Sequence, residues 1–260
     1  MIQRELRILQ ASLIFFTRIP LCPMDSFSAG AFQKASRYFP VVGWIVGITG
    51  AFAYMGAVLL FPRALAVLIS MTATILLTGA LHEDGFADFC DGMGAGWTRE
   101  QILSIMKDSY IGVYGTLALI LSLGAKLLCL LALPGNLLPF ALVCGHSLSR
   151  SSAISMMYTH DYAGKEDRSS KSRSVAERMS IQTLIFTTLT GILPFALFST
   201  AISSWPVFWI GLSVVIGVRL GLGWYLFHKL HGYTGDCLGA VQQISELTFY
   251  LALVVLTSGP

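Results

Sequence analysis

The sequence predicts an all-α fold: a polytopic membrane helix bundle of about seven transmembrane helices, preceded by an N-terminal interfacial amphipathic helix. Composition is the first observation, because 55% of the 260 residues are hydrophobic and only 12% are charged, whereas about a quarter of the residues in soluble domains are charged. The mean hydropathy of +0.70 is the second. The third is a series of apolar runs that approach the roughly 20 residues needed to cross a bilayer.

Residues 2 to 20 are predicted to form the amphipathic helix. Charged residues, among them Arg4 and Arg18, flank a short apolar run from Ala11 to Phe16. No small-residue cleavage pattern follows this run, so a cleaved signal peptide is not expected. A segment with one charged and one apolar side is typical of a helix that lies on the membrane surface.

The transmembrane helices follow in one membrane domain, residues 1–260, without an internal repeat. Pro40, Pro62, Pro134 and Pro206 mark the places where helices start or the chain turns back. The predicted spans are 41 to 61, 64 to 81, 110 to 133, 137 to 158, 181 to 200, 205 to 227 and 241 to 257.

The basic residues predict the orientation of these spans. Lys and Arg collect in cytoplasmic loops, and here one set of alternate loops is strongly basic while the opposite set holds only Arg63. We therefore expect a multi-pass protein of the cytoplasmic (inner) membrane with a cytoplasmic N-terminus, an external C-terminus and polar motifs that face the cytoplasm. The basic set is Arg4, Arg7, Arg18, Lys34, Arg37, Arg99, Lys107, Lys165, Arg168, Lys171, Arg173, Arg178 and Lys229.

Net charge and cysteine spacing argue against several kinds of partner and site. The net charge of +3 is small and the basic residues are scattered, so no nucleic-acid partner is predicted. The five cysteines include no C-x-x-C pair and no metal-binding spacing, which argues against a disulfide framework and a zinc site.

An unusually acidic stretch from His82 to Asp108 follows the second span. If the helix from Ala64 continues through it, Asp84, Asp88 and Asp91 fall within about 60° of one another at 100° per residue. Like charges on one helix face repel, and Mg²⁺ is commonly held by one or two carboxylates together with substrate phosphates. The three aspartates are therefore predicted as metal ligands and catalytic acids. The alternative is an acidic loop that is merely solvated at the membrane edge.

Glycine and alanine residues surround these acids, and small residues leave the backbone open for close approach by a ligand. Glu83 lies about 100° away from the acidic face and is ranked below the three aspartates.

A second motif occupies residues 231 to 246, HGYTGDCLGAVQQISE. On a helix, Asp236 and Glu246 share a face with Gly239 to within about 80°. Gly235 suits a tight turn before that helix, whose amino end favours anions such as phosphate. We predict that Gly235, Asp236 and Glu246 bind substrate and that the two motifs form opposite walls of one site.

Three further charged residues are candidates for the same site. Lys107 could neutralise phosphate and Asp108 could orient a ligand, although an interfacial ion pair is the alternative. Arg150 is predicted roughly two turns inside the fourth span, where a charge usually faces the bundle interior or a watery cavity. Its planar guanidinium matches phosphate oxygens, which makes it a candidate phosphate clamp.

Three sequence patterns in this order, HxDGxADxxDG, IMKDSxIGxxG and GxTGDxLGAxxxxxE, resemble those of the cobalamin synthase family, membrane enzymes also called adenosylcobinamide-GDP ribazoletransferases. The resemblance runs the length of the chain and includes TRIP at 17 to 20, FPVVG at 39 to 43 and LSR at 148 to 150. Three departures stand out: Glu83, where the family is often apolar, Tyr110, where it is often Arg, and His231, where it is often Gly.

The resemblance implies the step that completes the nucleotide loop of vitamin B12. A hydroxyl of α-ribazole, or of its 5′-phosphate, would attack the phosphorus attached to adenosylcobinamide in adenosylcobinamide-GDP, and GMP would leave. It also implies a Mg²⁺ requirement, with the lipid bilayer as a partner; a homo-oligomer is left open. By position, it implies metal binding by Asp84, Asp88 and Asp91, with support from Asp108, Asp236 and Glu246.

Two alternative functions fit part of the pattern, one a rival membrane enzyme and the other a protein of a different class. A CDP-alcohol phosphotransferase also clusters aspartates on a cytoplasmic membrane helix, but Phe-Cys-Asp-Gly follows Ala87-Asp88 here and does not match that signature. A cation transporter would place its charges near the bilayer midplane, whereas these acids are predicted at one membrane face.

Overall fold

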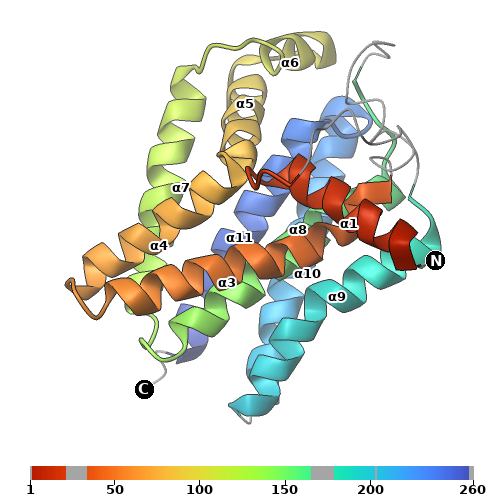
Figure 1. The fold of residues 1–260 in the computed structure, drawn as a ribbon. Coiled ribbons are helices and arrows are strands. Elements are labelled where there is room, and N and C mark those ends of the chain that lie inside the picture. The colour runs from red at the N-terminus through yellow and green to blue at the C-terminus, as the bar shows by residue number, and fades with distance from the viewer. Residues whose placement is uncertain (1, 22–33, 165–178, 203, 258–260) are drawn as a thin grey trace.

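The computed structural model describes residues 2–21, 34–164, 179–202 and 204–257, so the basic loop at 165–178 lies outside the described residues. All regular elements in these ranges are helices, which confirms the predicted all-α bundle (Figure 1). The elements are α1 (Ile2–Phe16), η2 (Ser36–Tyr38), α3 (Phe39–Ala57), α4 (Arg63–Thr78), α5 (Leu81–Ala95), α6 (Arg99–Ile105), α7 (Val113–Ala132), α8 (Leu138–Thr159), α9 (Ile181–Ala201), α10 (Trp205–Leu230) and α11 (Gly235–Thr257).

Five of the described helices are long and apolar enough to cross a membrane: the helix formed by η2 and α3 together, and α7, α9, α10 and α11. The bent pair of α4 and α5 passes the same test when it is taken as one broken span, which makes six. Helix α8 is 22 residues long, but its polar stretch CGHSLSRSS lowers its hydropathy. That stretch is buried inside the bundle, so its polar groups do not meet lipid. The described residues therefore give five or six candidate spans; α8 is not among them, and a seventh crossing stays a prediction.

The acidic motif does not continue the helix before it, so that part of the prediction is wrong. Helices α4 and α5 meet at 87°, and the break lies at Gly79 and Ala80, whose φ angles of 65° and 57° are left-handed. The backbone N–H of Arg18 donates to the carbonyl of Leu77 at 2.7 Å, and the Arg18 side chain fills the space where a Cβ on Gly79 would stand. The segment after α1 therefore packs against the break from which α5 starts.

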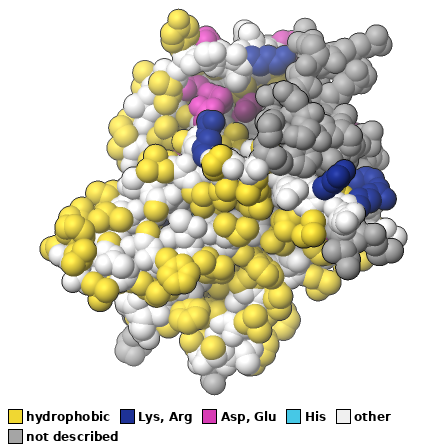
Figure 2. Space-filling model, viewed as in Figure 1, with side chains coloured by type: hydrophobic (Ala, Val, Ile, Leu, Met, Phe, Trp, Pro, Cys, Tyr) yellow, Lys and Arg dark blue, Asp and Glu magenta, His cyan; other side chains and the backbone are white. Residues whose placement is uncertain are grey.

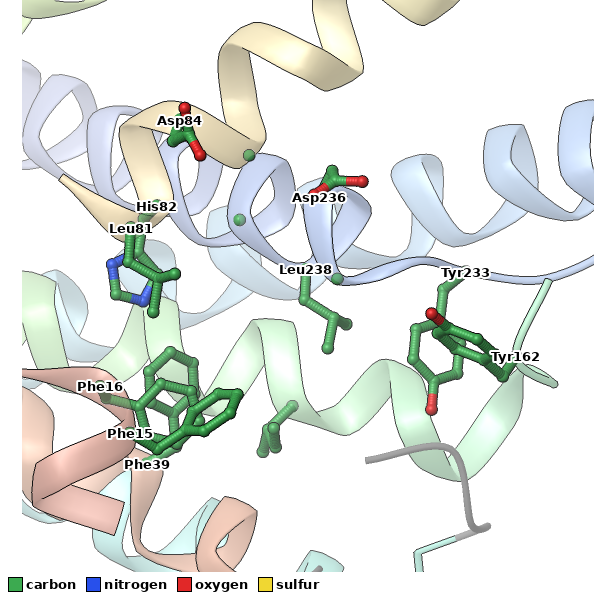
Figure 3. Close-up of a pocket in the computed structure, with 14 residues that line it drawn as sticks. Phe15, Phe16, Phe39, Leu81, His82, Asp84, Tyr162, Tyr233, Asp236 and Leu238 are labelled. Atoms are coloured by element: carbon green, nitrogen blue, oxygen red, sulfur yellow. The ribbon is translucent and has the colours of Figure 1, made fainter. Parts of the chain in front are cut away.

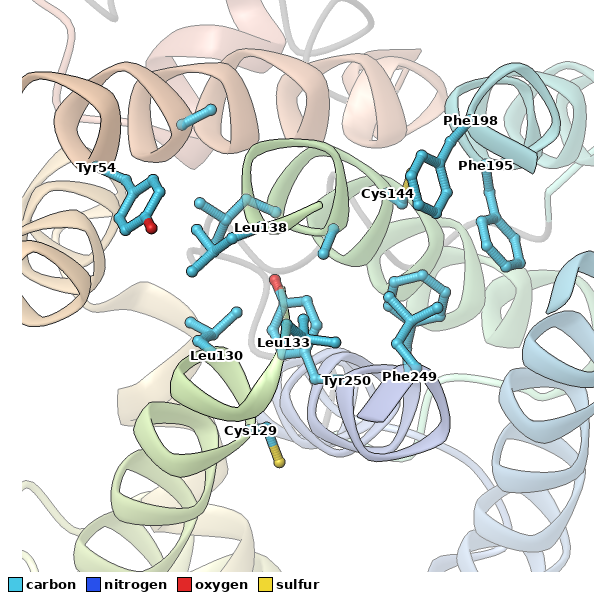
Figure 4. Packing of buried hydrophobic residues seen from close by; sticks show 14 of the residues in the cluster. Tyr54, Cys129, Leu130, Leu133, Leu138, Cys144, Phe195, Phe198, Phe249 and Tyr250 are labelled. Atoms are coloured by element: carbon cyan, nitrogen blue, oxygen red, sulfur yellow. The ribbon is translucent and has the colours of Figure 1, made fainter. Parts of the chain in front are cut away.

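The larger of two buried clusters lies between α3, α7, α8, α9 and α11 (Figure 4). Leu130, Leu138, Phe195 and Phe249 are fully buried there. The ring of Phe195 packs edge-on against Phe249 at 5.0 Å between centroids. Within a bilayer, such close packing replaces the hydrophobic effect as the force that holds helices together. This cluster fixes α8 and α11, which both carry polar residues of the predicted site.

A second buried cluster joins α1, α5, α6 and the ends of α8 and α10 around the beginning of α11. Two backbone hydrogen bonds shape this region, from Ala163 N–H to the Tyr233 carbonyl at 2.8 Å and from Tyr233 N–H to the Asp161 carbonyl at 3.0 Å. They bind the turn before α11 to the segment after α8. The turn at residues 232 to 236, called the GYTGD turn below, is therefore held in place by backbone contacts on one side and by the second cluster on the other.

A stability prediction follows from His231, which ends α10 with a left-handed φ of 53°. Glycine adopts this conformation without the strain of a side chain, so we expect His231→Gly to raise the free energy of unfolding by about 1 kcal/mol. Unfolding in mixed detergent micelles measures the change. His228→Gly in the last turn of α10 is the matched control and should lower stability by about 1 kcal/mol; equal effects of the two variants would contradict the assignment.

Candidate active site

The two predicted motifs meet where α5 crosses α11. A Cβ added to Gly85 would lie 3.0 Å from the Cα of Asp236, and one added to Gly239 would lie 3.1 Å from the carbonyl oxygen of His82. Small residues at a crossing let two membrane helices approach backbone to backbone. Gly85 and Gly239 therefore allow close contact between two helices. The sequence had predicted instead that the small residues leave space for a ligand. The crossing brings the two motifs together, as the sequence predicted.

The crossing also gathers negative charge. Asp88 lies within electrostatic range of Asp236, Asp84 and Asp91, and Asp236 in turn lies within range of Asp84. Acidic side chains gather in the upper part of the face shown in Figure 2. Carboxylates held this close repel one another, and a bound cation would relieve the repulsion. The local charge thus favours a ligand that brings positive charge, such as a divalent metal.

The three predicted metal ligands do not form a ready-made ligand set. Among the described residues, no group of three His, Cys, Asp or Glu side chains is placed to hold one ion. Mg²⁺ usually takes only one or two carboxylates and completes its shell with water and substrate phosphates. Asp84 and Asp236, which both line one cavity, fit that donor set.

Asp91 has a structural partner that the sequence did not reveal. Its Oδ2 accepts a hydrogen bond from the backbone N–H of Gly112 at 2.7 Å and its Oδ1 accepts one from Gly115 at 2.9 Å. These groups belong to the amino end of α7, where backbone N–H groups lack partners within the helix. Asp91 therefore fastens α7 to α5 with its buried carboxylate. Its role as a metal ligand stays a prediction.

A cavity of about 250 Å³ opens beside the crossing (Figure 3). Asp84 and Asp236 lie on one side of it, and Phe15, Phe16 and Phe39 gather on the opposite side. The phenylalanines come from α1 and from the start of α3, so the amino-terminal helix closes the site. The cavity thus has a negative wall and an aromatic wall facing each other. Sequence reasoning missed the aromatic wall, because an interfacial helix was expected to turn its apolar side to lipid.

Two tyrosines close a third side of the cavity. The rings of Tyr162 and Tyr233 meet edge to face, with 5.7 Å between their centroids. Burial, followed by the neighbouring Tyr162 and Asp161, raises the pKa of Tyr233 above its ordinary value. The Tyr233 hydroxyl therefore stays protonated at neutral pH, where it can donate a hydrogen bond.

Of the other residues predicted for the site, one lines the cavity and two lie on the exposed surface of the protein. Gly235 lines the cavity, and a Cβ there would meet no atom within 4 Å. Its backbone is open to a ligand, as the sequence predicted. Lys107 and Asp108 are exposed beyond α6 and do not line the cavity. The carboxylate of Asp108 accepts a hydrogen bond from the backbone N–H of Tyr110 at 3.2 Å, which shapes the turn before α7.

Arg150 and Glu246 do not line the cavity but belong to a buried polar network behind its wall, where the guanidinium of Arg150 lies 5.5 Å from the ring of Phe39. Glu246 Oε1 lies 3.0 Å from Lys126 Nζ, and Glu246 Oε2 lies 3.1 Å from His146 Nδ1. Gln242 donates to the same Oε2 at 2.6 Å, and Arg150 donates to the backbone carbonyl of His146 at 3.0 Å. The geometry assigns both predicted substrate ligands to the interior of the protein, where they hold α7, α8 and α11 together.

The same network reaches the acidic motif. Lys126 Nζ donates to Gln243 Oε1 at 3.0 Å, and Gln243 Nε2 donates to Glu83 Oε1 at 2.9 Å. Glu83 thus points away from the aspartates, in agreement with its angle on the helix, and it anchors α5 to α11. Lys126 is the residue from which this network could have been predicted in the sequence, because a cation within an apolar span usually needs a buried partner.

The fold and the site together define an integral membrane enzyme whose acidic residues face a small aromatic cavity. The chain belongs to the cobalamin-5-phosphate synthase family, whose sequence profile matches residues 8–254. It is thus a transferase-type membrane enzyme of cobalamin biosynthesis, which favours this class over the phosphotransferase and transporter alternatives.

Relatives of similar length bear one common name. Proteins of Ralstonia nicotianae and Shewanella amazonensis are each named adenosylcobinamide-GDP ribazoletransferase. The first is 41% identical over 256 residues, 97% of this chain and 96% of the relative. The second is 42% identical over 260 residues, 98% of each chain. No solved structure matches this chain.

Proposed function

We propose that this chain joins adenosylcobinamide-GDP to α-ribazole, or to α-ribazole 5′-phosphate, and releases GMP. The products are adenosylcobalamin, or its 5′-phosphate, and GMP. The observation that carries the proposal is the crossing of α5 and α11, which places both family motifs on one cavity of a chain that is about 40% identical to named ribazoletransferases over nearly its full length. Phosphoryl transfer requires positioning and charge neutralisation more than covalent chemistry by the protein.

The described residues support each part of this reaction. The open backbone at Gly235 and the amino end of α11 suit a phosphate group of the donor. One of the aspartates on the acidic side of the cavity can accept the proton of the attacking ribose hydroxyl. The oxygen of that hydroxyl forms a bond to phosphorus while the bond from phosphorus to the oxygen of GMP breaks. When Mg²⁺ is bound, Asp84 and Asp236 would hold it, and it would neutralise charge on the phosphates.

The proposal includes the orientation of the protein. The asymmetry of the basic loops supports a cytoplasmic N-terminus and an acidic site on the cytoplasmic side of the inner membrane, and seven crossings would put the C-terminus outside. A phosphatase reporter that is active only outside the cytoplasm, fused after Pro260, is therefore expected to be active. The same reporter inserted after Gly96, between α5 and α6, should be inactive. Reversed activities would contradict the orientation, and activity in neither fusion would contradict the count of crossings.

An assay of GMP release tests the reaction. Purified protein is mixed with adenosylcobinamide-GDP, α-ribazole and Mg²⁺, and GMP and the corrinoid product are followed together by chromatography. We expect GMP and adenosylcobalamin in equal amounts, and neither product when α-ribazole or Mg²⁺ is left out. GMP release without α-ribazole would show a hydrolase, and no release under any condition would overturn the proposed function.

A further inference from the structure

The cavity beside the crossing differs in character between its two sides. Its surface is mainly apolar, with Phe15, Phe16 and Phe39 forming one side. The imidazole of His82 lies 5.4 Å from the ring of Phe39 and is nearly parallel to it, at 19°. These flat groups surround a space of about 250 Å³. A space of this size, with aromatic walls and few polar groups, is typical of a site for a small flat ligand.

We propose that this cavity binds the aromatic base of the acceptor nucleoside. The inference rests on the proposed function and deepens it by assigning the substrate groups to parts of the site. α-Ribazole is a ribonucleoside whose base is a benzimidazole, a flat and mostly apolar ring system. With the base between the phenylalanines and Leu238, the ribose faces Asp84 and Asp236 on the opposite side. The reacting hydroxyl then lies at the acidic wall.

The other large groups of the substrates do not fit the same space. A corrin ring carries four nitrogen-containing rings and many side chains, which makes it far larger than this cavity. Guanine is small enough, but it presents hydrogen-bond donors and acceptors on several edges. Against phenylalanine side chains those polar groups would lose their hydrogen-bond partners, which weakens binding. Size excludes the corrinoid and polarity disfavours guanine.

His82 adds a polar group that matches a benzimidazole. The side chain is 4% exposed, and its Nε2 has no hydrogen-bond partner among the described residues. Buried polar groups without partners are rare, and His82 is one of the residues that line the cavity, so its imidazole is available to a ligand there. A benzimidazole nucleoside keeps one free ring nitrogen that can accept a hydrogen bond. The vacant imidazole and this single ring nitrogen are complementary.

Leu238 offers a direct test, because its side chain extends from α11 into the cavity (Figure 3). Leu238→Ala enlarges the cavity, so we expect it to lower the Michaelis constant for a ribonucleoside with a three-ring naphthimidazole base about 10-fold relative to the unaltered protein. Leu238→Phe fills the cavity and should raise the Michaelis constant for α-ribazole about 10-fold. Neither change should alter the Michaelis constant for adenosylcobinamide-GDP more than about 2-fold, since its corrinoid and guanine groups lie outside the space that Leu238 borders.

Leu247→Ala is the matched control, because Leu247 is a partly buried leucine of the same helix that packs against the larger cluster, away from the cavity. It should leave the preference between the two bases unchanged. The inference is overturned if Leu238→Ala and Leu247→Ala shift this preference equally, or if the Leu238 variants change the constant for adenosylcobinamide-GDP instead. The unaltered protein must first release GMP with α-ribazole; failure at that stage concerns the proposed function, whereas active protein with unshifted preference concerns the base site alone.

Discussion

Asp84→Asn is expected to lower the rate of GMP release at least about 100-fold, which corresponds to about 3 kcal/mol of lost transition-state stabilisation. The amide keeps the shape of the carboxylate but loses the charge that would hold Mg²⁺ against the substrate phosphates. Asp84 is exposed at the cavity, so the change removes no packing and the protein should still insert and fold. Single-turnover rates at saturating substrate measure the loss, and Mg²⁺ titration should show a raised metal requirement.

Glu100→Gln is the matched control for this variant. Glu100 is an exposed acid of α6 that does not line the cavity, and the change likewise turns a carboxylate into an amide. It should leave the rate within about 2-fold of the unaltered protein. A rate for Asp84→Asn that equals the rate for Glu100→Gln would remove Asp84 from the reaction.

The second large effect is expected on stability. Lys126→Met should lower the free energy of unfolding by about 3 kcal/mol, because it leaves Glu246 buried without its cationic partner. The ammonium and the carboxylate lie 3.0 Å apart and are both almost completely buried. Methionine matches the length of the lysine stem, so the loss comes from the charge rather than from a cavity. Unfolding by sodium dodecyl sulfate in mixed micelles provides the measurement.

Two comparisons separate this effect from a general loss of charge. Lys107→Met makes the same change at an exposed site and should shift stability by no more than about 0.5 kcal/mol. Adding Glu246→Gln to Lys126→Met removes the unpaired charge, so the double variant should recover at least about 1 kcal/mol. Additive losses in the double variant would mean that Lys126 and Glu246 stabilise the bundle independently.

Much of the fold was predictable because the lipid environment constrains the sequence so strongly. Each apolar run in the chain corresponds to a helix, and Pro62 and Pro206 lie at helix starts, as predicted. The break between α4 and α5 was not predictable, since Ala80 gives no sign that it adopts a left-handed φ. That break is maintained by contacts with Arg18, which lies far away in the sequence.

The part of the candidate site that consists of residues within the two local sequence motifs was predictable. Asp84 and Asp236 belong to separate motifs, and their charge and glycine neighbours indicated that both serve one site. The burial of Glu246 was not apparent, because Lys126, its partner, lies on another helix. The contribution of Phe15 to the cavity was equally hidden, since hydrophobic periodicity alone does not distinguish a side turned to lipid from one turned to a site.

The central claim is that the acidic motif of α5 and the GYTGD turn of α11 form a single site across the crossing at Gly85 and Gly239. A double-mutant cycle with Asp84→Asn and Asp236→Asn, read by single-turnover release of GMP, tests it most directly. If both carboxylates serve one metal and one phosphate group, removing the second one costs little once the first is gone. The rate of GMP release by the double variant should then be within about 3-fold of the rate of the slower single variant. Losses that multiply in full would show that the two aspartates act independently and would contradict the account.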